Sequence, residues 1–257
     1  MLQKQIALII GSSCLLSVPF AEKLEQQGYI PVLTTRNVSC LNSRNISPRC
    51  IILHTLDFMN PNAIEYLISS VKSICEKTSA RLAKVFYLAA HLATSSSDIL
   101  ESEEDMKIYY RVNRDVPYEL ASYFLKEDSS IEFIYLSTPA IRTKTGLKGF
   151  EAYTFSKKQG DRLMNLLCIE HPDYQITFFY PSQIKGSDCQ KNYLQDTSTG
   201  LLRKIFLYVS QKFMKTPEQL ADVFFKKSAK GKIKIYGDFP AWLVFHLSPT
   251  LAQFLCR

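Results

Sequence analysis

The sequence has little of the residues that mark fibrous, linker-like or disulfide-bonded proteins. Only 9 of its 257 residues are glycine and 11 are proline, which excludes a collagen-like or low-complexity chain. The seven cysteines are widely spaced, with no Cys-x-x-Cys pair and no cysteine–histidine cluster. They favour reduced thiols in a cytoplasmic protein, and we expect neither a disulfide framework nor a metal site.

Long hydrophobic runs are also missing, because none reaches the roughly 18 residues that a transmembrane helix needs. The chain does start with Lys4 and the apolar residues 6–10, a pattern that resembles a short signal peptide. We favour a different interpretation, a buried strand followed by a loop and a helix. The apolar run ends at Gly11, and an amphipathic pattern over residues 20–27 stops at Gly28.

The charge balance is basic, with 31 lysines and arginines against 24 acidic residues and a net charge of +7. The excess is strongest near the C-terminus, at lysines 226, 227, 230, 232 and 234. Such a surplus favours anionic ligands such as nucleotide phosphates or lipid headgroups. No stretch resembles a nucleic-acid reading motif, so we do not expect nucleic acid as a partner.

Short apolar runs alternate with helical patterns along the whole chain. The expected strands cover residues 5–10, 29–34, 50–56, 84–90, 131–136, 175–180 and 232–236. The expected helices cover residues 18–27, 62–75, 103–125, 153–170, 200–213 and 217–227. This alternation predicts an α/β, Rossmann-type doubly wound fold, with a mostly parallel sheet and helices on both faces. We expect a single nucleotide-binding domain over residues 1–257 with an apolar C-terminal tail at 239–257.

The first expected strand ends where a dinucleotide-binding loop normally has glycines. Glycines let the backbone approach the diphosphate, whose charge lies at the N-terminus of the next helix. Only Gly11 remains here. The spacing GxxGxxG places the small Cys14 and Ser17 at the later positions, whereas GxxxGxG would place Leu15 against a phosphate. We predict cofactor contacts from Gly11, Ser12, Ser13, Cys14 and Leu16.

Residues after the next three strands also bear on the cofactor. Arg36 follows the second strand with no acidic residue beside it. An arginine here accommodates the 2′-phosphate of NADP(H), whereas an acid would bind the ribose of NAD(H). We therefore predict NADP(H) as the preferred cofactor and NAD(H) as the alternative. The further expected cofactor contacts are Asp57, Phe58, Ala89, Ala90 and His91, although Asp57 as a turn residue and His91 as a structural residue are competing interpretations.

The fifth expected strand runs into Ser137-Thr138, and Tyr153 precedes Lys157 by four residues. On a helix this spacing places a phenol and an ammonium group on one face, where the ammonium can make the phenol a usable acid near neutral pH. The spacing alone is unspecific, because a second Tyr-x-x-x-Lys occurs at residues 208–212. Only Tyr153 follows a strand that ends in Ser-Thr within the βαβ series.

Together these segments resemble the short-chain dehydrogenase/reductase family. Residues 86–91, 133–138 and 153–157 resemble motifs of its epimerase/dehydratase-like branch, and residues 176–182 resemble the strand that leads to the nicotinamide-side loop. Asn113 falls where the family has a helix asparagine. The C-terminal part from Thr216 is more like the classical branch, and is similar to reductases of lipid-linked keto-sugars and related hydrophobic substrates.

The resemblance implies a role for each candidate catalytic residue. Tyr153 would donate a proton to a substrate carbonyl as hydride arrives from the nicotinamide, and Lys157 would bind the nicotinamide ribose. Both would therefore also contact the cofactor. Thr138, or Ser137 beside it, would hydrogen-bond the carbonyl, and Asn113 would hold a water that relays protons to Lys157. The expected cofactor contacts after the sixth strand are Pro181, Gln183 and Ile184.

The sequence therefore predicts an NADP(H)-dependent oxidoreductase that reduces a carbonyl, or oxidises the alcohol, of a small or lipid-/sugar-type substrate. It departs from the family in lacking two loop glycines and the Asn-Asn-Ala-Gly of the fourth strand. The alternatives are a non-catalytic NADP(H)-binding pseudoenzyme and a nucleotide-sugar epimerase or dehydratase with tightly bound NAD. The resemblance implies a homodimer or homotetramer.

The tail at residues 239–257 contains the single tryptophan, Trp242, and follows the lysine-rich segment. One interpretation is an interfacial element that contacts an anionic membrane, which would place the protein peripherally at the membrane. The interpretation that we favour is a tail docked on its own domain or on a second subunit. Pro240 and Pro249 exclude a long helix in this region.

Overall fold

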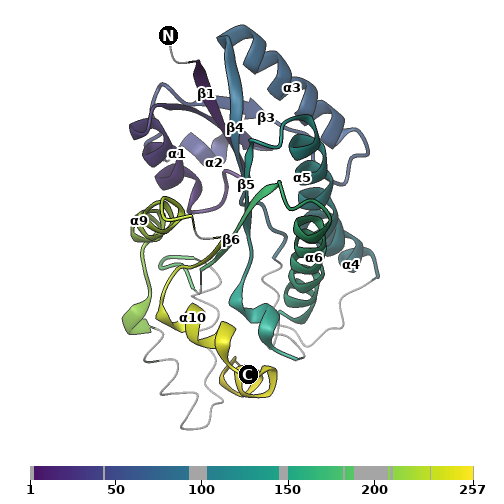
Figure 1. The fold of residues 1–257 in the computed structure, drawn as a ribbon, viewed down its shortest axis with the longest axis vertical. Helices are drawn as coiled ribbons and strands as arrows, with labels where there is room; N and C mark the ends of the chain where they lie inside the picture. The colour runs from purple at the N-terminus through teal and green to yellow at the C-terminus, as the bar shows by residue number, and fades with distance from the viewer. Residues whose placement is uncertain are drawn as a thin grey trace.

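The computed structural model describes residues 3–42, 44–92, 103–144, 150–181, 183–187, 208, 211–231 and 233–256. Within them, seven parallel strands form one sheet in the order β3-β2-β1-β4-β5-β6-β7 (Figure 1). The strands are β1 (Lys4–Ile10), β2 (Tyr29–Thr35), β3 (Ile51–His54), β4 (Ala80–Tyr87), β5 (Glu132–Leu136), β6 (Gln175–Tyr180) and β7 (Lys234–Tyr236). The strand order reverses between β1 and β4, so the predicted doubly wound fold is confirmed.

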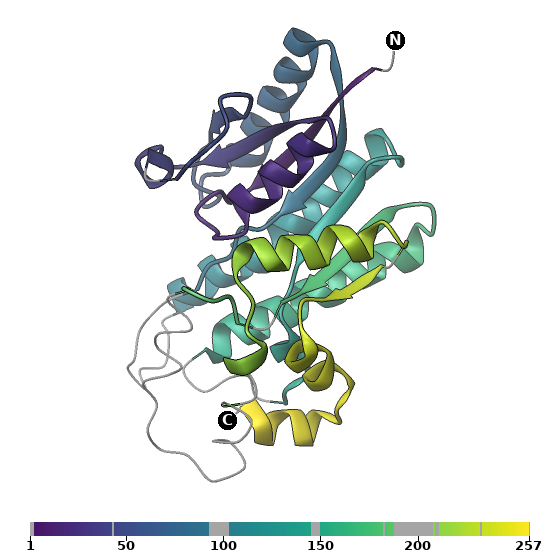
Figure 2. The same cartoon turned by 90° about the vertical axis from the view of Figure 1, so that its left-hand side faces the viewer.

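Helices cover both faces of the sheet (Figures 1 and 2). One face carries α1 (Ser17–Gln26) and α9 (Pro217–Ser228), and the other carries α3 (Ala63–Thr78), α5 (Val116–Glu127) and α6 (Glu151–Glu170). The shorter segments are α2 (Ser39–Asn42), α4 (Glu103–Tyr110), the π-helix η1 (Arg111–Asp115), the 3-10 helix η2 (Pro139–Arg142), α10 (Phe239–His246) and α11 (Pro249–Cys256).

The residues of β1 alternate between two buried clusters. Ile6, Leu8 and Ile10 pack in the cluster that contains side chains of α3, α5 and α6. Ala7 and Ile9 pack in the cluster that contains side chains of α1 and α9. Because a central parallel strand is buried on both faces, every position must be apolar, which is why this strand was recognisable as a continuous run.

The strand boundaries differ from the sequence prediction in two main places. β3 is shorter than the predicted 50–56, because it is an edge strand paired only with β2. β4 begins at Ala80 instead of residue 84 and ends at Tyr87. Its early polar residue Lys84 is accommodated by an ion pair with Glu132 on the neighbouring β5. The helix predicted over residues 200–213 lies largely outside the described residues.

The helix predicted over residues 103–125 is present as one unbroken helical stretch, but the π-helix η1 divides it into α4 and α5. Pro117 has no N–H to donate to the carbonyl of Asn113 four residues earlier, so a regular helix cannot continue there. The hydroxyls of two tyrosines in the sheet donate hydrogen bonds to carbonyls of this turn instead. Tyr135 donates to Asn113 O at 3.0 Å and Tyr87 donates to Val112 O at 2.5 Å.

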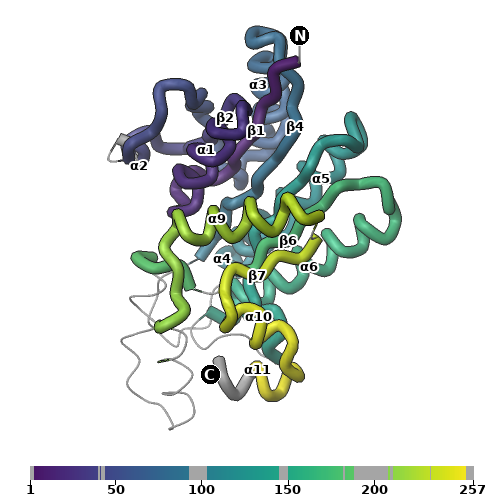
Figure 3. Tube along the Cα trace, turned by 60° about the vertical axis from the view of Figure 1, so that its left-hand side comes forward, coloured from purple at the N-terminus to yellow at the C-terminus, as the bar shows by residue number. Residues whose placement is uncertain are grey.

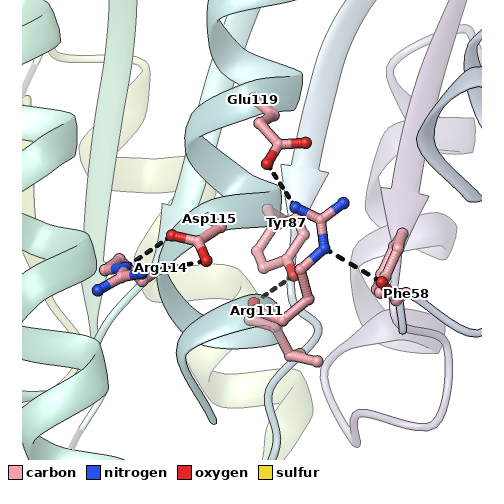
Figure 4. Close-up of polar contacts among 7 residues, drawn as sticks. Phe58, Tyr87, Arg111, Arg114, Asp115 and Glu119 are labelled. Carbon is pink, nitrogen blue, oxygen red and sulfur yellow. Dashed lines mark hydrogen bonds and ion pairs between the residues drawn. The ribbon is translucent and has the colours of Figure 1, made fainter. Parts of the chain in front are cut away.

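Arginines hold the same turn from the outside (Figure 4). Arg111 donates from Nε to the carbonyl of Phe58 at 3.2 Å and forms an ion pair with Glu119 of α5. Arg114 forms an ion pair with its neighbour Asp115 at 2.6 Å. The π-turn is therefore tied both to the segment after β3 and to the helix that follows it.

The C-terminal tail docks on its own chain beyond the carboxyl ends of β6 and β7 (Figure 3). The ring of Phe245 in α10 lies 4.8 Å from that of Tyr180 and 5.0 Å from that of Tyr236. This agrees with the docking that we favoured, and the two short helices each begin at a proline-containing turn as expected. Within the described part of the chain, no helix has both the length and the apolar character to cross a membrane.

We predict that Gly160→Ala destabilises the protein. A Cβ at Gly160 in α6 would lie 2.4 Å from the carbonyl of Asn113 and 2.6 Å from the hydroxyl of Tyr135. Urea unfolding should show a loss of about 1–3 kcal/mol. Alanine has a higher helix propensity than glycine, so a loss of stability can come only from the steric clash. Arg162→Ala, at an exposed position of the same helix, is the control, and equal stability of the two variants would contradict the prediction.

Candidate functional site

The candidate site lies at the carboxyl ends of the strands, at the point between β1 and β4 where the strand order reverses. The backbones of the two strand ends approach closely there, since a Cβ on Gly11 would lie 2.5 Å from the amide nitrogen of Ala89. Gly11 also has a φ of +96°, which side chains rarely tolerate. The one remaining glycine of the loop is therefore required by the geometry.

The loop after Gly11 keeps backbone amides available for a ligand. The amide of Gly11 donates to the hydroxyl of Thr34 at 3.2 Å, and the amide of Ser12 donates to the carbonyl of Thr34 at 3.1 Å. Those of Ser13 and Leu15 have no acceptor among the residues that the structure describes. Two unpaired amides beside the N-terminus of α1 suit the oxygens of a diphosphate. The loop therefore fits the predicted cofactor in spite of its missing glycines.

The carbonyls of the same loop are bound by Arg44, which follows α2. Its Nη1 donates to the carbonyls of Ser12 at 2.8 Å and Cys14 at 3.0 Å, and its Nη2 donates to the carbonyl of Ser13 at 2.9 Å. Sequence reasoning missed Arg44. It lies about 30 residues from its partners in an irregular segment, so no local pattern indicates this contact.

Arg36, the predicted partner of a 2′-phosphate, is exposed at the end of β2. It forms an ion pair with Asp57, and both side chains are accessible, at 68% and 47%. Partial burial acts to raise the pKa of Asp57, but the Met59 amide and the Arg36 guanidinium lower it overall. An exposed pair of this kind is weak, so a phosphate can compete for the arginine. Phe58 next to it offers its carbonyl to Arg111.

Lys157 is buried, with 1% of its surface exposed. Its Nζ donates to the carbonyl of Leu136 at 2.9 Å and lies 5.0 Å from the centre of the Tyr135 ring. Burial lowers the pKa of Lys157 to about 8, against the raising effect of Asp161. Tyr153 is half-buried one turn earlier on the same face of α6. The predicted pair thus shares one helix face at the end of β5.

Ser137 and Thr138 face different surroundings. Thr138 is partly exposed, and its hydroxyl oxygen accepts the amide of Ala140 at 3.3 Å to cap η2, which leaves its proton for another acceptor. Ser137 is buried, and its hydroxyl lies beside the carboxyl of Asp161. Of the two hydroxyls, that of Thr138 is the better placed to reach a ligand.

Asn113 connects three segments around the site. Its side-chain amide donates to the carbonyl of His91 and to the hydroxyl of Ser156, each at 3.0 Å, and its Oδ1 accepts the amide of His91 at 2.9 Å. Its own carbonyl accepts the hydroxyl of Tyr135. These bonds make Asn113 a link between β4, η1 and α6, and its role in a water relay stays a prediction.

A buried acid, Asp161, lies one turn after Lys157 and was not singled out from the sequence. It accepts a hydrogen bond from the hydroxyl of Tyr180 at 3.0 Å, and burial raises its pKa. Its position four residues after Lys157 on a helix was a usable signal, because this spacing places the two side chains on one face. Asp161 supplies the nearby negative charge that partly offsets the burial of the Lys157 cation.

The remaining predicted contacts lie along the same edge of the sheet. His91 is half-buried, with its ring 4.6 Å from that of Tyr109 in an edge-to-face contact, which agrees with the structural interpretation. Ala90 is exposed just before it. Beyond β6, Pro181 is buried and Gln183 and Ile184 are half-buried, and Ile184 packs against the same core cluster as Cys14 of the β1 loop.

No protein-family profile and no curated protein sequence matches the chain. Solved structures do match it over most of its length. A short-chain dehydrogenase from Burkholderia cenocepacia J2315 in complex with NADP has 14% identity and a TM-score of 0.70, covering 94% of this chain and 91% of that chain. One from Streptomyces avermitilis has 14% identity and a TM-score of 0.72, covering 95% and 92%. A metagenomic short-chain oxidoreductase in complex with NADP has 19% identity and a TM-score of 0.64, covering 91% and 97%.

The chain therefore has the fold of the short-chain dehydrogenases/reductases, as its motifs led us to expect. At these identities the likeness concerns the fold, and the activity must be argued from the site. No group of three or more histidine, cysteine, aspartate or glutamate side chains that could hold a metal occurs in the described part of the chain.

We predict that Lys157→Met changes how stability depends on pH. The pKa of Lys157 falls from 10.5 to about 8 on folding, so the unfolded chain binds more protons between these values. Burial of the cation is therefore most costly below about pH 8 and is relieved towards pH 10.5. Urea unfolding should show the wild type gaining about 3 kcal/mol relative to the variant over this window. Lys158→Met, at the exposed neighbour, is the matched control, and a pH-independent difference for Lys157→Met would contradict the prediction.

Proposed function

We propose that the protein is an NADP(H)-dependent oxidoreductase that reduces a carbonyl group or oxidises the corresponding alcohol. The observation that carries this proposal is the buried Lys157 at the carboxyl edge of the sheet, one helical turn after Tyr153 on α6. The loop after Gly11 and the exposed Arg36 supply fitting contacts for the cofactor. Several structural neighbours were crystallised with NADP or NADPH, which supports the cofactor class.

The proposed chemistry assigns each side chain one task. The nicotinamide, when bound, supplies or accepts the hydride. Thr138 donates its hydroxyl proton to the substrate oxygen and holds it in place, while Tyr153 transfers the phenolic proton to that oxygen during reduction. Lys157 uses one of its three protons for Leu136, so two remain to bind a ribose hydroxyl and to favour the phenolate of Tyr153.

Two other functions make different predictions for the purified protein. A nucleotide-sugar epimerase or dehydratase would release NAD on denaturation, whereas the proposed reductase exchanges its cofactor freely. A pseudoenzyme would bind NADP(H) but show no turnover in a carbonyl screen. The substrate class, a homodimeric or homotetrameric assembly and membrane contact of residues 239–257 stay predictions.

Tyr153→Phe should abolish most of the carbonyl reduction without weakening the binding of NADPH. Loss of a positioned general acid lowers kcat by roughly 10²–10⁴-fold. NADPH oxidation in a carbonyl screen gives kcat, and calorimetry gives the dissociation constant. Tyr208→Phe is the matched control, because Tyr208 begins the second Tyr-x-x-x-Lys and is 69% exposed. If both variants keep wild-type turnover, Tyr153 is not the acid.

Arg36→Ala should weaken binding of NADPH about 10- to 100-fold, because a charged hydrogen bond to phosphate is lost. Binding of NADH should stay unchanged, since NADH has no 2′-phosphate. Titration of both cofactors, followed by nicotinamide fluorescence, measures the two constants. Arg49→Ala, at another exposed arginine, is the control. Equal weakening of both cofactors by Arg36→Ala would assign the arginine a different role.

A further inference from the structure

We propose that Arg44 is the positioning residue that holds the glycine-poor β1 loop in the shape that binds the cofactor's diphosphate. The inference rests on the proposed function. It deepens that function by naming the side chain that fixes the shape of a loop from which two glycines are absent. Arg44 comes from outside the strand–loop–helix unit, after α2, and contacts the loop with both terminal nitrogens of its guanidinium group.

Four hydrogen bonds define the contact. Nη1 donates to the carbonyls of Ser12 and Cys14 at 2.8 and 3.0 Å and to the hydroxyl of Ser17 at 3.2 Å. Nη2 donates to the carbonyl of Ser13 at 2.9 Å. The planar fork of arginine presents several donors at fixed angles, which a lysine cannot reproduce. Three consecutive carbonyls of the loop are thereby gathered around one cation.

Binding of these carbonyls also fixes the direction of the amides. In a trans peptide the C=O of one residue and the N–H of the next point in opposite directions. The carbonyls of Ser12 and Cys14 face Arg44, so the amides of Ser13 and Leu15 must face away from it. Neither of these amides has an acceptor among the described residues. Arg44 therefore presents two free donors together on the opposite side of the loop.

The peptide between Ser13 and Cys14 forms its hydrogen bond within the loop. The carbonyl of Ser13 faces Arg44, and the amide of Cys14 that follows it donates to the carbonyl of Gly11 at 3.0 Å. Ser17, which stands at a glycine position of the GxxGxxG spacing, donates its hydroxyl to the carbonyls of Ser12 and Cys14, each at 2.8 Å. The loop thus depends on one network of side-chain donors centred on Arg44 and Ser17.

The charge of Arg44 adds to this geometry. Among the described residues it has no carboxylate partner, in contrast to Arg36 and Arg49, so its positive charge is not neutralised within the protein. An anion on the amide side of the loop is attracted by this charge as well as by the two N–H groups. Since the diphosphate is common to NADPH and NADH, Arg44 should matter equally for both.

The experiment compares Arg44→Gln, Arg44→Lys and Arg49→Gln with the wild type. Titration with NADPH and with NADH should show that Arg44→Gln raises both dissociation constants by the same factor, at least about tenfold. Arg44→Lys, which keeps the charge but loses the fork, should recover only part of this loss. Arg49→Gln should bind both cofactors as the wild type does.

Hydrogen exchange of the cofactor-free protein provides a second readout. Peptides covering residues 11–17 should exchange faster in Arg44→Gln than in the wild type, while peptides of the central strands β1 and β4 should not change. This readout identifies a loop held by Arg44 even in the absence of any cofactor. It also shows whether the variant is folded, and Arg44→Lys replaces it if Arg44→Gln is not.

Three results would overturn the inference. The first is a folded Arg44→Gln variant with unchanged binding of both cofactors. The second is weakening confined to NADPH, which would make Arg44 a partner of the 2′-phosphate. The third is unchanged exchange of residues 11–17. A wild type that binds neither cofactor would instead overturn the proposed function, and faster exchange in Arg44→Gln would still show the effect of Arg44 on the loop.

Discussion

A cation held away from water is the constraint on which the candidate site depends. The ammonium of Lys157 is removed from solvent and makes one hydrogen bond within the part of the chain that the structure describes, to the carbonyl of Leu136. Such a group persists only where the surrounding structure compensates for it. Here the compensation comes from the Tyr135 ring and the buried carboxyl of Asp161. A side chain with unused donors at the edge of a sheet is well suited to bind the hydroxyls of a sugar.

The π-turn η1 fixes the positions of the segments that surround Lys157. Pro117 leaves the carbonyl of Asn113 without its helical donor, and Tyr135 from the sheet takes its place. The side chain of Asn113 then ties the segment after β4 to α6, the helix that carries Tyr153 and Lys157. A local defect in one helix thus fixes the position of another, which explains why Gly160 must be small where the two cross.

Much of the fold and part of the site could be predicted from the sequence. The strands were recognisable because burial on both faces requires unbroken apolar runs, and the Tyr153–Lys157 spacing becomes specific once a strand ending in Ser-Thr precedes it. The start of β4 was missed because Arg81 and Lys84 interrupt its apolar pattern. Arg44 could not be found, because its partners lie about 30 residues away and only the folded chain brings them together. The different surroundings of Ser137 and Thr138 likewise depend on tertiary contacts, since Asp161 reaches Ser137 from α6.

The strand order also has a consequence for synthesis on the ribosome. β1 is an interior strand, but its two neighbours, β2 and β4, are made at very different times, since β4 ends only at Tyr87. Until then the nascent chain carries an apolar strand with one unpaired edge, a surface that readily pairs with other chains. Parallel pairing across so long a separation is also slow. While the segment between β2 and β4 is being made, the growing chain therefore exposes this strand edge.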